Sequence, residues 1–121
     1  MILRNSYIFL FVLIFSCASA QRKERLEKLK QKLESTKGVE DTNRVKDLIL
    51  MARMMYRSDN QYSLKYSKEA VVIASKLKRA DLQMDALNAT ADGFWYVAEY
   101  DKAFDFYYKA YKLADSIGNK K

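Results

Sequence analysis

Apolar and small residues recur along the second half of the chain at the three- and four-residue spacing of an α-helix. A clear stripe passes through Leu87, Ala91, Phe94, Ala103, Tyr107 and Ala110. An earlier, less regular copy contains Leu48, Ala52, Met55, Ser63, Ser67 and Ala70. Each stripe is interrupted once by a short polar segment, so each copy predicts two helices joined by a turn. Helical hairpins that repeat in this way bury their apolar faces against one another.

Capping and helix-ending residues predict where these helices begin and end. A helix is expected to begin after Asp41 or Thr42, because either side chain can cap it. The segments Ser58-Asp59-Asn60 and Glu99-Tyr100-Asp101 are expected to be turns, and the last helix should end at Gly118. The intervening helices are expected over about 62–77 and about 82–97. Connections this short make neighbouring helices antiparallel.

The charged segment 22–36 has a narrow apolar stripe of its own, formed by Leu26, Leu29 and Leu33. We expect these leucines to pack against the first hairpin, so that residues 21–38 form a capping helix that ends at Gly38. A short coiled coil and a basic helix that binds anionic lipid or nucleic acid are the alternatives. The stripe covers fewer than two heptads, and acidic residues are mixed with the basic ones, so the cap is favoured.

Residues 1–20 have the pattern of a secretory signal peptide. Arg4 precedes an unbroken apolar run over residues 7–15, and an A-x-A ending follows at Ala20. We therefore expect export and cleavage after Ala20. The alternative is a lipoprotein signal, in which Cys17, the single cysteine of the chain, would become the lipidated first residue.

Composition favours an all-α fold and excludes several kinds of chemistry. The 121 residues include no proline and only three glycines. A sheet protein of this size would need more of these turn-forming residues. With no histidine, the usual general base and commonest metal ligand are missing. We expect no enzymatic activity, no cofactor and no metal. Asp85, Asn88 and Asp92 share one helix face, but carboxylates at this spacing are usually solvated.

The clear copy, residues 87–110, resembles the tetratricopeptide repeat in its pattern L-x3-A-x2-F-x8-A-x3-Y-x2-A. The resemblance implies antiparallel helical hairpins stacked as a short solenoid, with a degenerate repeat at 42–78 and a clear one at 80–118. Small residues would let helices approach closely, and large ones would fill the gaps. These packing residues would be Leu48, Ala52, Leu87, Ala91, Phe94, Ala103, Tyr107 and Ala110.

The resemblance also implies a binding groove, because the first helix of each repeat lines the concave face in this family. The groove residues would be Lys46, Ile49, Arg53, Arg57, Asp85, Asn88, Asp92 and Tyr96. Arg53 and Arg57 would pair with a carboxylate of an extended peptide or a partner helix. The family's carboxylate clamp is not matched, since Asp92 stands where an amide is expected. That these are merely solvated polar positions is an equally open interpretation.

The last predicted helix is rich in aromatic residues: Phe104, Phe106, Tyr107, Tyr108 and Tyr111. No polar helix follows them, so we expect this face to be covered by further repeats of a longer protein, with a second copy or another partner as the alternatives.

Three functions follow as hypotheses. The first is a non-enzymatic protein-binding module in the bacterial periplasm or cell envelope. The second is implied by a resemblance: a signal peptide, a charged helix and long repeats together resemble the N-terminal region of exported bacterial signalling proteins, so the chain would be the sensory part of a larger histidine kinase or transcriptional regulator. The third is a basic binder of membrane or nucleic acid through residues 22–37. We expect no nucleic-acid partner, because no aromatic side chains are interleaved with the basic ones. A membrane contact is expected only if Cys17 is lipidated or the full protein continues into a membrane span.

Overall fold

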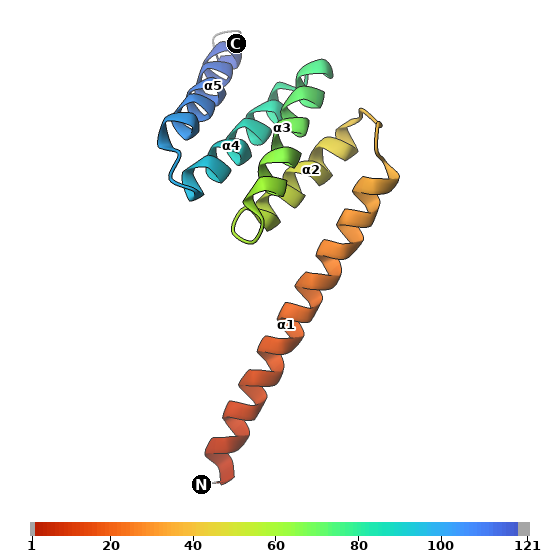
Figure 1. Cartoon of the computed structure of the whole chain (residues 1–121), viewed down its shortest axis with the longest axis vertical. Helices are drawn as coiled ribbons and strands as arrows, with labels where there is room; N and C mark the ends of the chain where they lie inside the picture. The colour runs from red at the N-terminus through yellow and green to blue at the C-terminus, as the bar shows by residue number, and fades with distance from the viewer. Residues whose placement is uncertain (1, 119–121) are drawn as a thin grey trace.

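The chain is all-helical in the part that the structure, a computed structural model, describes. That part covers residues 2–118, with side chains from residue 4 onward. It contains no strand and five helices: α1 (Ile2–Ser35), α2 (Thr42–Met55), α3 (Asn60–Lys76), α4 (Ala80–Tyr96) and α5 (Tyr100–Gly118). Helices α2 to α5 pack side by side, while the N-terminal half of α1 extends away from them (Figure 1).

Each helix packs mainly against its neighbours in the sequence. The pairs α2–α3, α3–α4 and α4–α5 have the most extensive contacts, and α2 also contacts α4. Within residues 2–118, the backbone of α1 comes close only to that of α2, and the backbone of α5 comes close only to that of α4. Helix α5 therefore lies at one end of the packed group, with one side covered by α4 and the other side open.

Two aspartates cap helices in the first hairpin. The Asp41 side chain accepts a hydrogen bond from the Arg44 amide at 2.8 Å, and Asp59 accepts one from the Tyr62 amide at 3.3 Å. Since Asp59 is the N-cap of α3, that helix begins at Asn60. The expectation that Asn60 belonged to the turn is therefore wrong, and the turn lies at residues 56–58.

The connections after α3 and α4 share one geometry. Lys78 and Ala98 both adopt left-handed backbone angles, with φ of 53° and 62°. In each case the next amide reaches back to a carbonyl inside the helix, from Arg79 to Ala74 at 3.1 Å and from Glu99 to Phe94 at 3.0 Å. This pairing satisfies carbonyls that a helix end leaves free. The chain reverses so tightly that α4 begins at Ala80, two residues before the expected Leu82, and α5 begins at Tyr100.

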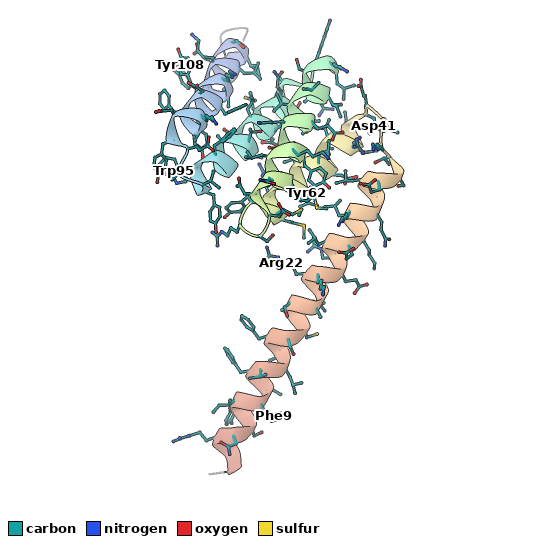
Figure 2. The ribbon with its side chains drawn as sticks, in the orientation of Figure 1. Phe9, Arg22, Asp41, Tyr62, Trp95 and Tyr108 are labelled. Atoms are coloured by element: carbon teal, nitrogen blue, oxygen red, sulfur yellow. The ribbon has the colours of Figure 1, made fainter. Side chains whose placement is uncertain are left out.

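Helix α1 is continuous from Ile2 to Ser35, although its two halves differ in packing. Every side chain from residue 4 to residue 25 is exposed, and Phe9 stands clear of the rest of the molecule (Figure 2). Leu33 is buried in the core, and Leu26 and Leu29 pack against it. The predicted leucine stripe thus contacts the helices that follow. None of the helices in residues 2–118 is long and apolar enough to cross a membrane.

Most residues of the repeated stripe are buried between the packed helices. Leu87, Ala91, Phe94, Ala103 and Ala110 are buried, as are Leu48, Ala52, Ser63, Ser67 and Ala70, whereas Met55 and Tyr107 are half-buried. Ser63 is polar and buried, and its hydroxyl donates to the carbonyl of Ala52 at 2.8 Å. A buried hydroxyl carries little penalty when it is hydrogen-bonded, so a serine fits this close approach of α2 and α3.

Candidate functional site

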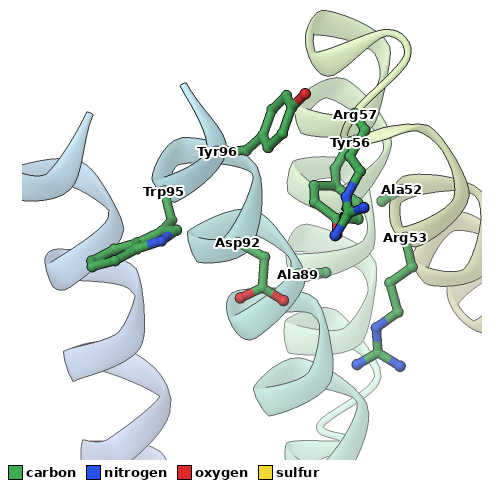
Figure 3. A pocket seen from close by; sticks show the side chains of 8 residues that line it. All are labelled: Ala52, Arg53, Tyr56, Arg57, Ala89, Asp92, Trp95 and Tyr96. Carbon is green, nitrogen blue, oxygen red and sulfur yellow. Dashed lines mark hydrogen bonds between the residues drawn. The ribbon is translucent and has the colours of Figure 1, made fainter. Parts of the chain in front are cut away.

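A cavity of about 300 Å3 opens between the C-terminal ends of α2 and α4. Its lining consists of Ala52, Arg53, Tyr56, Arg57, Ala89, Asp92, Trp95 and Tyr96 (Figure 3). The α2 side supplies the arginines, and the α4 side supplies Asp92. The cavity exists because its innermost residues, Ala52 and Ala89, are small and buried, which leaves space above them for a ligand side chain.

Aromatic side chains form much of the wall. The rings of Tyr56 and Tyr96 meet edge to face, with centroids 5.5 Å apart and planes at 85°. The ring of Trp95 contacts the ring of Tyr100, with centroids 4.8 Å apart. Aromatic pairs prefer such geometry, and it stabilises the orientation of each ring. The wall therefore offers a fixed apolar surface with two phenolic hydroxyls.

The two arginines have few competing partners. Arg53 Nη2 lies 4.0 Å from Asp85 Oδ1, and both side chains are more than half exposed. Such a solvated pair contributes at most about 1 kcal/mol, so a ligand can displace it. The guanidinium of Arg57 lies 5.2 Å from the centre of the Tyr56 ring, and its Nε donates to the Tyr56 hydroxyl at 2.7 Å. A guanidinium has five N–H donors, so Arg57 keeps donors for a ligand.

Asp92 brings negative charge to the opposite side of the cavity. Its carboxylate accepts a hydrogen bond from the hydroxyl of Tyr107 on α5. Burial, together with this hydrogen bond, raises the pKa of Tyr107 to about 12, so the hydroxyl remains a donor at neutral pH. The cavity is thus positive along α2 and negative along α4.

The predicted groove residues are only partly brought together here. Arg53, Arg57, Asp92 and Tyr96 line the cavity, and Asp85 lies beside it through its contact with Arg53. The other polar candidates do not line it: Lys46 is exposed elsewhere on α2, and Asn88 is half-buried on α4.

Ile49 is a correction to the predicted groove. It is 5% exposed and belongs to the hydrophobic core instead of the surface. Helix α2 contacts α1, α3 and α4, so apolar residues around most of its circumference are covered. A pattern of two-helix hairpins predicts that a smaller part of the α2 surface is covered. For this reason Ile49 was expected to face outward.

Tyr56 and Trp95 line the cavity, although helical periodicity did not predict either of them. Tyr56 follows the last helical residue of α2, and Trp95 lies next to the buried stripe on α4, so neither falls on a repeated position. Their aromatic character close to helix ends was the only available signal. No group of three or more His, Cys, Asp or Glu side chains that could hold a metal occurs among the described residues.

No protein-family model, curated protein or solved structure matches this chain.

Proposed function

We propose that this protein is a non-enzymatic interaction module that binds an extended peptide segment between α2 and α4. The observation that carries the proposal is a pair of weakly engaged arginines beside a fixed aromatic wall. Arginine and tyrosine are the residue types that most often dominate binding to proteins. A peptide with an acidic side chain next to an aromatic or large aliphatic one has complementary chemistry.

The charge distribution specifies how such a peptide would bind. Its carboxylate would pair with Arg53 or Arg57, since a guanidinium offers charge-assisted hydrogen bonds to carboxylates. Its apolar side chain would contact Tyr56 and Tyr96 above the small residues of the cavity. Asp92 would repel a second carboxylate on the α4 side, so the acidic residue should lie on the α2 side only.

The proposal treats α2–α3 and α4–α5 as two tetratricopeptide-like repeats in a short solenoid, with residues 21–38 as its cap. Support comes from the buried Ala91 and Ala103 between α4 and α5 and from the contact of α2 with α4. The matching connections after α3 and α4 add to this support, because repeats tend to share their turn geometry.

The proposal also treats residues 1–20 as a signal peptide and assigns the mature protein to the periplasm or cell envelope. The exposure of residues 4–25 supports this, because cleavage after Ala20 would remove no side chain from the core. Mass spectrometry of the exported protein tests it. A mature N-terminus at Gln21 is expected, a lipidated Cys17 would indicate membrane anchoring, and an intact Met1 would contradict export by this route.

Peptide binding is tested by fluorescence anisotropy with two labelled peptides, one with a single aspartate next to phenylalanine and one with lysine in place of that aspartate. The acidic peptide is expected to bind and the basic one not to bind. Arg53→Glu and Arg57→Glu should each weaken binding by roughly tenfold or more, because attraction becomes repulsion.

Lys46→Glu is the matched control. It makes the same charge change on the same helix, at an exposed position outside the cavity. Its affinity should stay close to that of the unmodified protein. Equal weakening by all three variants would show general electrostatic attraction, and an acidic peptide that does not bind would contradict the proposal.

A further inference from the structure

Helix α5 carries an aromatic face that no described part of the chain covers. Toward α4, Ala103 and Ala110 are buried, and the ring of Phe106 stacks on Phe94 with centroids 5.5 Å apart. On the opposite side lie Phe104, Tyr108 and Tyr111, which are 68%, 51% and 63% exposed. Tyr108 lies at the outer edge of the packed helices (Figure 2).

The three exposed rings form one continuous strip. Their spacing of four and then three residues places them along one line of the helix, as in the seam of a coiled coil. Phe104 and Tyr108 stack with centroids 6.3 Å apart and planes at 10°, and Tyr108 and Tyr111 stack at 6.4 Å and 29°. A contiguous apolar strip of this kind marks an interaction surface.

Two opposite charges border this strip along one edge. Asp105 and Lys112 are seven residues apart, two turns of helix, so they lie above one another beside the rings. Both are exposed, and neither forms an ion pair with any residue in 2–118. These two residues thus place a negative charge on the N-terminal side of Tyr108 and a positive charge on its C-terminal side.

We infer that this face binds the same face of a second copy of the chain, with the two α5 helices antiparallel about a two-fold axis close to Tyr108. An antiparallel pairing brings Asp105 of each copy opposite Lys112 of the other, and the two-fold axis makes this contact twice. A parallel pairing about a two-fold axis places this edge of the two copies on opposite sides of the interface, so Asp105 and Lys112 would not meet between copies. The antiparallel arrangement is therefore the one whose charges are self-complementary, and it also covers the aromatic strip.

The dimer is independent of peptide binding, because the strip lies on the outer side of α5 and the cavity lies between α2 and α4. Further repeats of a longer protein, or an unrelated helix, could also cover the strip. Neither further repeats nor an unrelated helix requires that the edge charges be self-complementary. Reversing these charges therefore distinguishes such occupants from a second copy of the chain.

The test is sedimentation velocity on the full chain and on variants at the two edge positions. The unmodified chain is expected to form a dimer as its concentration rises. Asp105→Lys places lysine opposite lysine at both contacts, and Lys112→Asp places aspartate opposite aspartate. Each variant should dimerise at least roughly tenfold more weakly.

Mixing the two single variants is the decisive step. The lysines at 105 and 112 in one variant then face the aspartates at 112 and 105 in the other, so a mixed dimer should form with close to the original affinity. The double variant Asp105→Lys/Lys112→Asp should also pair with itself. Circular dichroism checks that each variant keeps its helical content.

Lys109→Asp is the control, because Lys109 is exposed on α5 but lies over the Phe106 ring, away from the proposed contact edge. It should dimerise like the unmodified chain. A chain that stays monomeric overturns the inference. So does association that persists in both single variants, as it would if residues 7–15 caused it, and so does a mixture that fails to recover dimerisation.

Discussion

Arg44 on α2 forms an ion pair with Glu69 on α3, with Nη2 2.7 Å from Oε1. The arginine is only 6% exposed. Its Nη1 donates to the carbonyl of Leu33 at 2.8 Å and to the hydroxyl of Thr36 at 3.0 Å. One side chain therefore connects the end of α1 to both helices of the first hairpin, and each nitrogen of its buried guanidinium donates at least one hydrogen bond.

Removing one member of this pair should destabilise the protein more than removing both. Glu69→Leu leaves the buried guanidinium without its carboxylate and is expected to cost about 3 kcal/mol. Arg44→Leu should cost less, because Glu69 is partly exposed and can be hydrated. The double variant should cost clearly less than the sum of the two. Urea unfolding measures all three, and strictly additive costs would show that the pair is not coupled.

Glycine at the two left-handed positions should stabilise the protein. A side chain in this backbone region costs about 1 kcal/mol, so Lys78→Gly and Ala98→Gly should each raise the free energy of unfolding by a similar amount. Lys65→Gly, at an exposed site inside α3, is the control and should lower it by roughly 0.5–1 kcal/mol. If Lys78→Gly or Ala98→Gly destabilised like the control, the left-handed geometry would be wrong.

Gly93 allows α4 to approach Leu64 of α3. A Cβ atom at this position would lie 2.8 Å from Leu64 Cδ2 and 3.3 Å from its Cγ. Leu64 is half-exposed, so its side chain can rotate, and the helix propensity gained by Gly93→Ala, about 1 kcal/mol, should offset most of the cost. For Gly93→Val, rotation of Leu64 and the gain in helix propensity do not offset the clash, so this variant should lower the free energy of unfolding by about 2 kcal/mol. Thermal unfolding should show that Leu64→Ala added to Gly93→Val recovers part of this loss.

The Tyr107–Asp92 hydrogen bond predicts a stability change at high pH. The folded-state pKa of Tyr107 is raised from 10.0 to about 12, first by burial and then by Asp92. Because the folded-state pKa is raised, the stabilisation by the protonated Tyr107 hydroxyl is fully present below pH 10 and is lost as the pH rises toward 12. The stability difference between the unmodified protein and Tyr107→Phe should therefore shrink across that window. A difference that does not change with pH would contradict the raised pKa.

Deleting residues 1–20 should leave the stability of the remaining helices unchanged. All side chains from residue 4 to residue 25 are exposed, and the first ones to pack on the core are Leu26 and Leu29. Extending the deletion through residue 29 should destabilise the protein, because it removes both leucines. Denaturant unfolding of the two shortened chains measures the difference. A loss above about 1 kcal/mol for the shorter deletion would indicate a contact by the deleted residues.

The helical fold could be predicted from the sequence because helical periodicity is a local property. Residues three and four apart lie on one side of a helix whatever it packs against, so the buried positions of Leu87, Ala91 and Ala103 follow from spacing alone. The start of α2 was also predictable to within one residue, after Asp41 or Thr42, since a cap acts on amides of its own first turn; the structure has Asp41 as the cap. The signal peptide and the binding of peptides stay predictions.

Other features were decided only when helices distant in sequence came together. Ile49 is buried because three helices surround α2, and Arg44 is buried because the end of α1 and Glu69 converge on it. Tyr56 and Tyr96, forty residues apart, meet at the cavity through the packing of α2 on α4. The sequence alone determined which residues share a helix face. The tertiary structure decided what each face contacts, because burial depends on the number and direction of neighbours, and the spacing within one helix does not encode them.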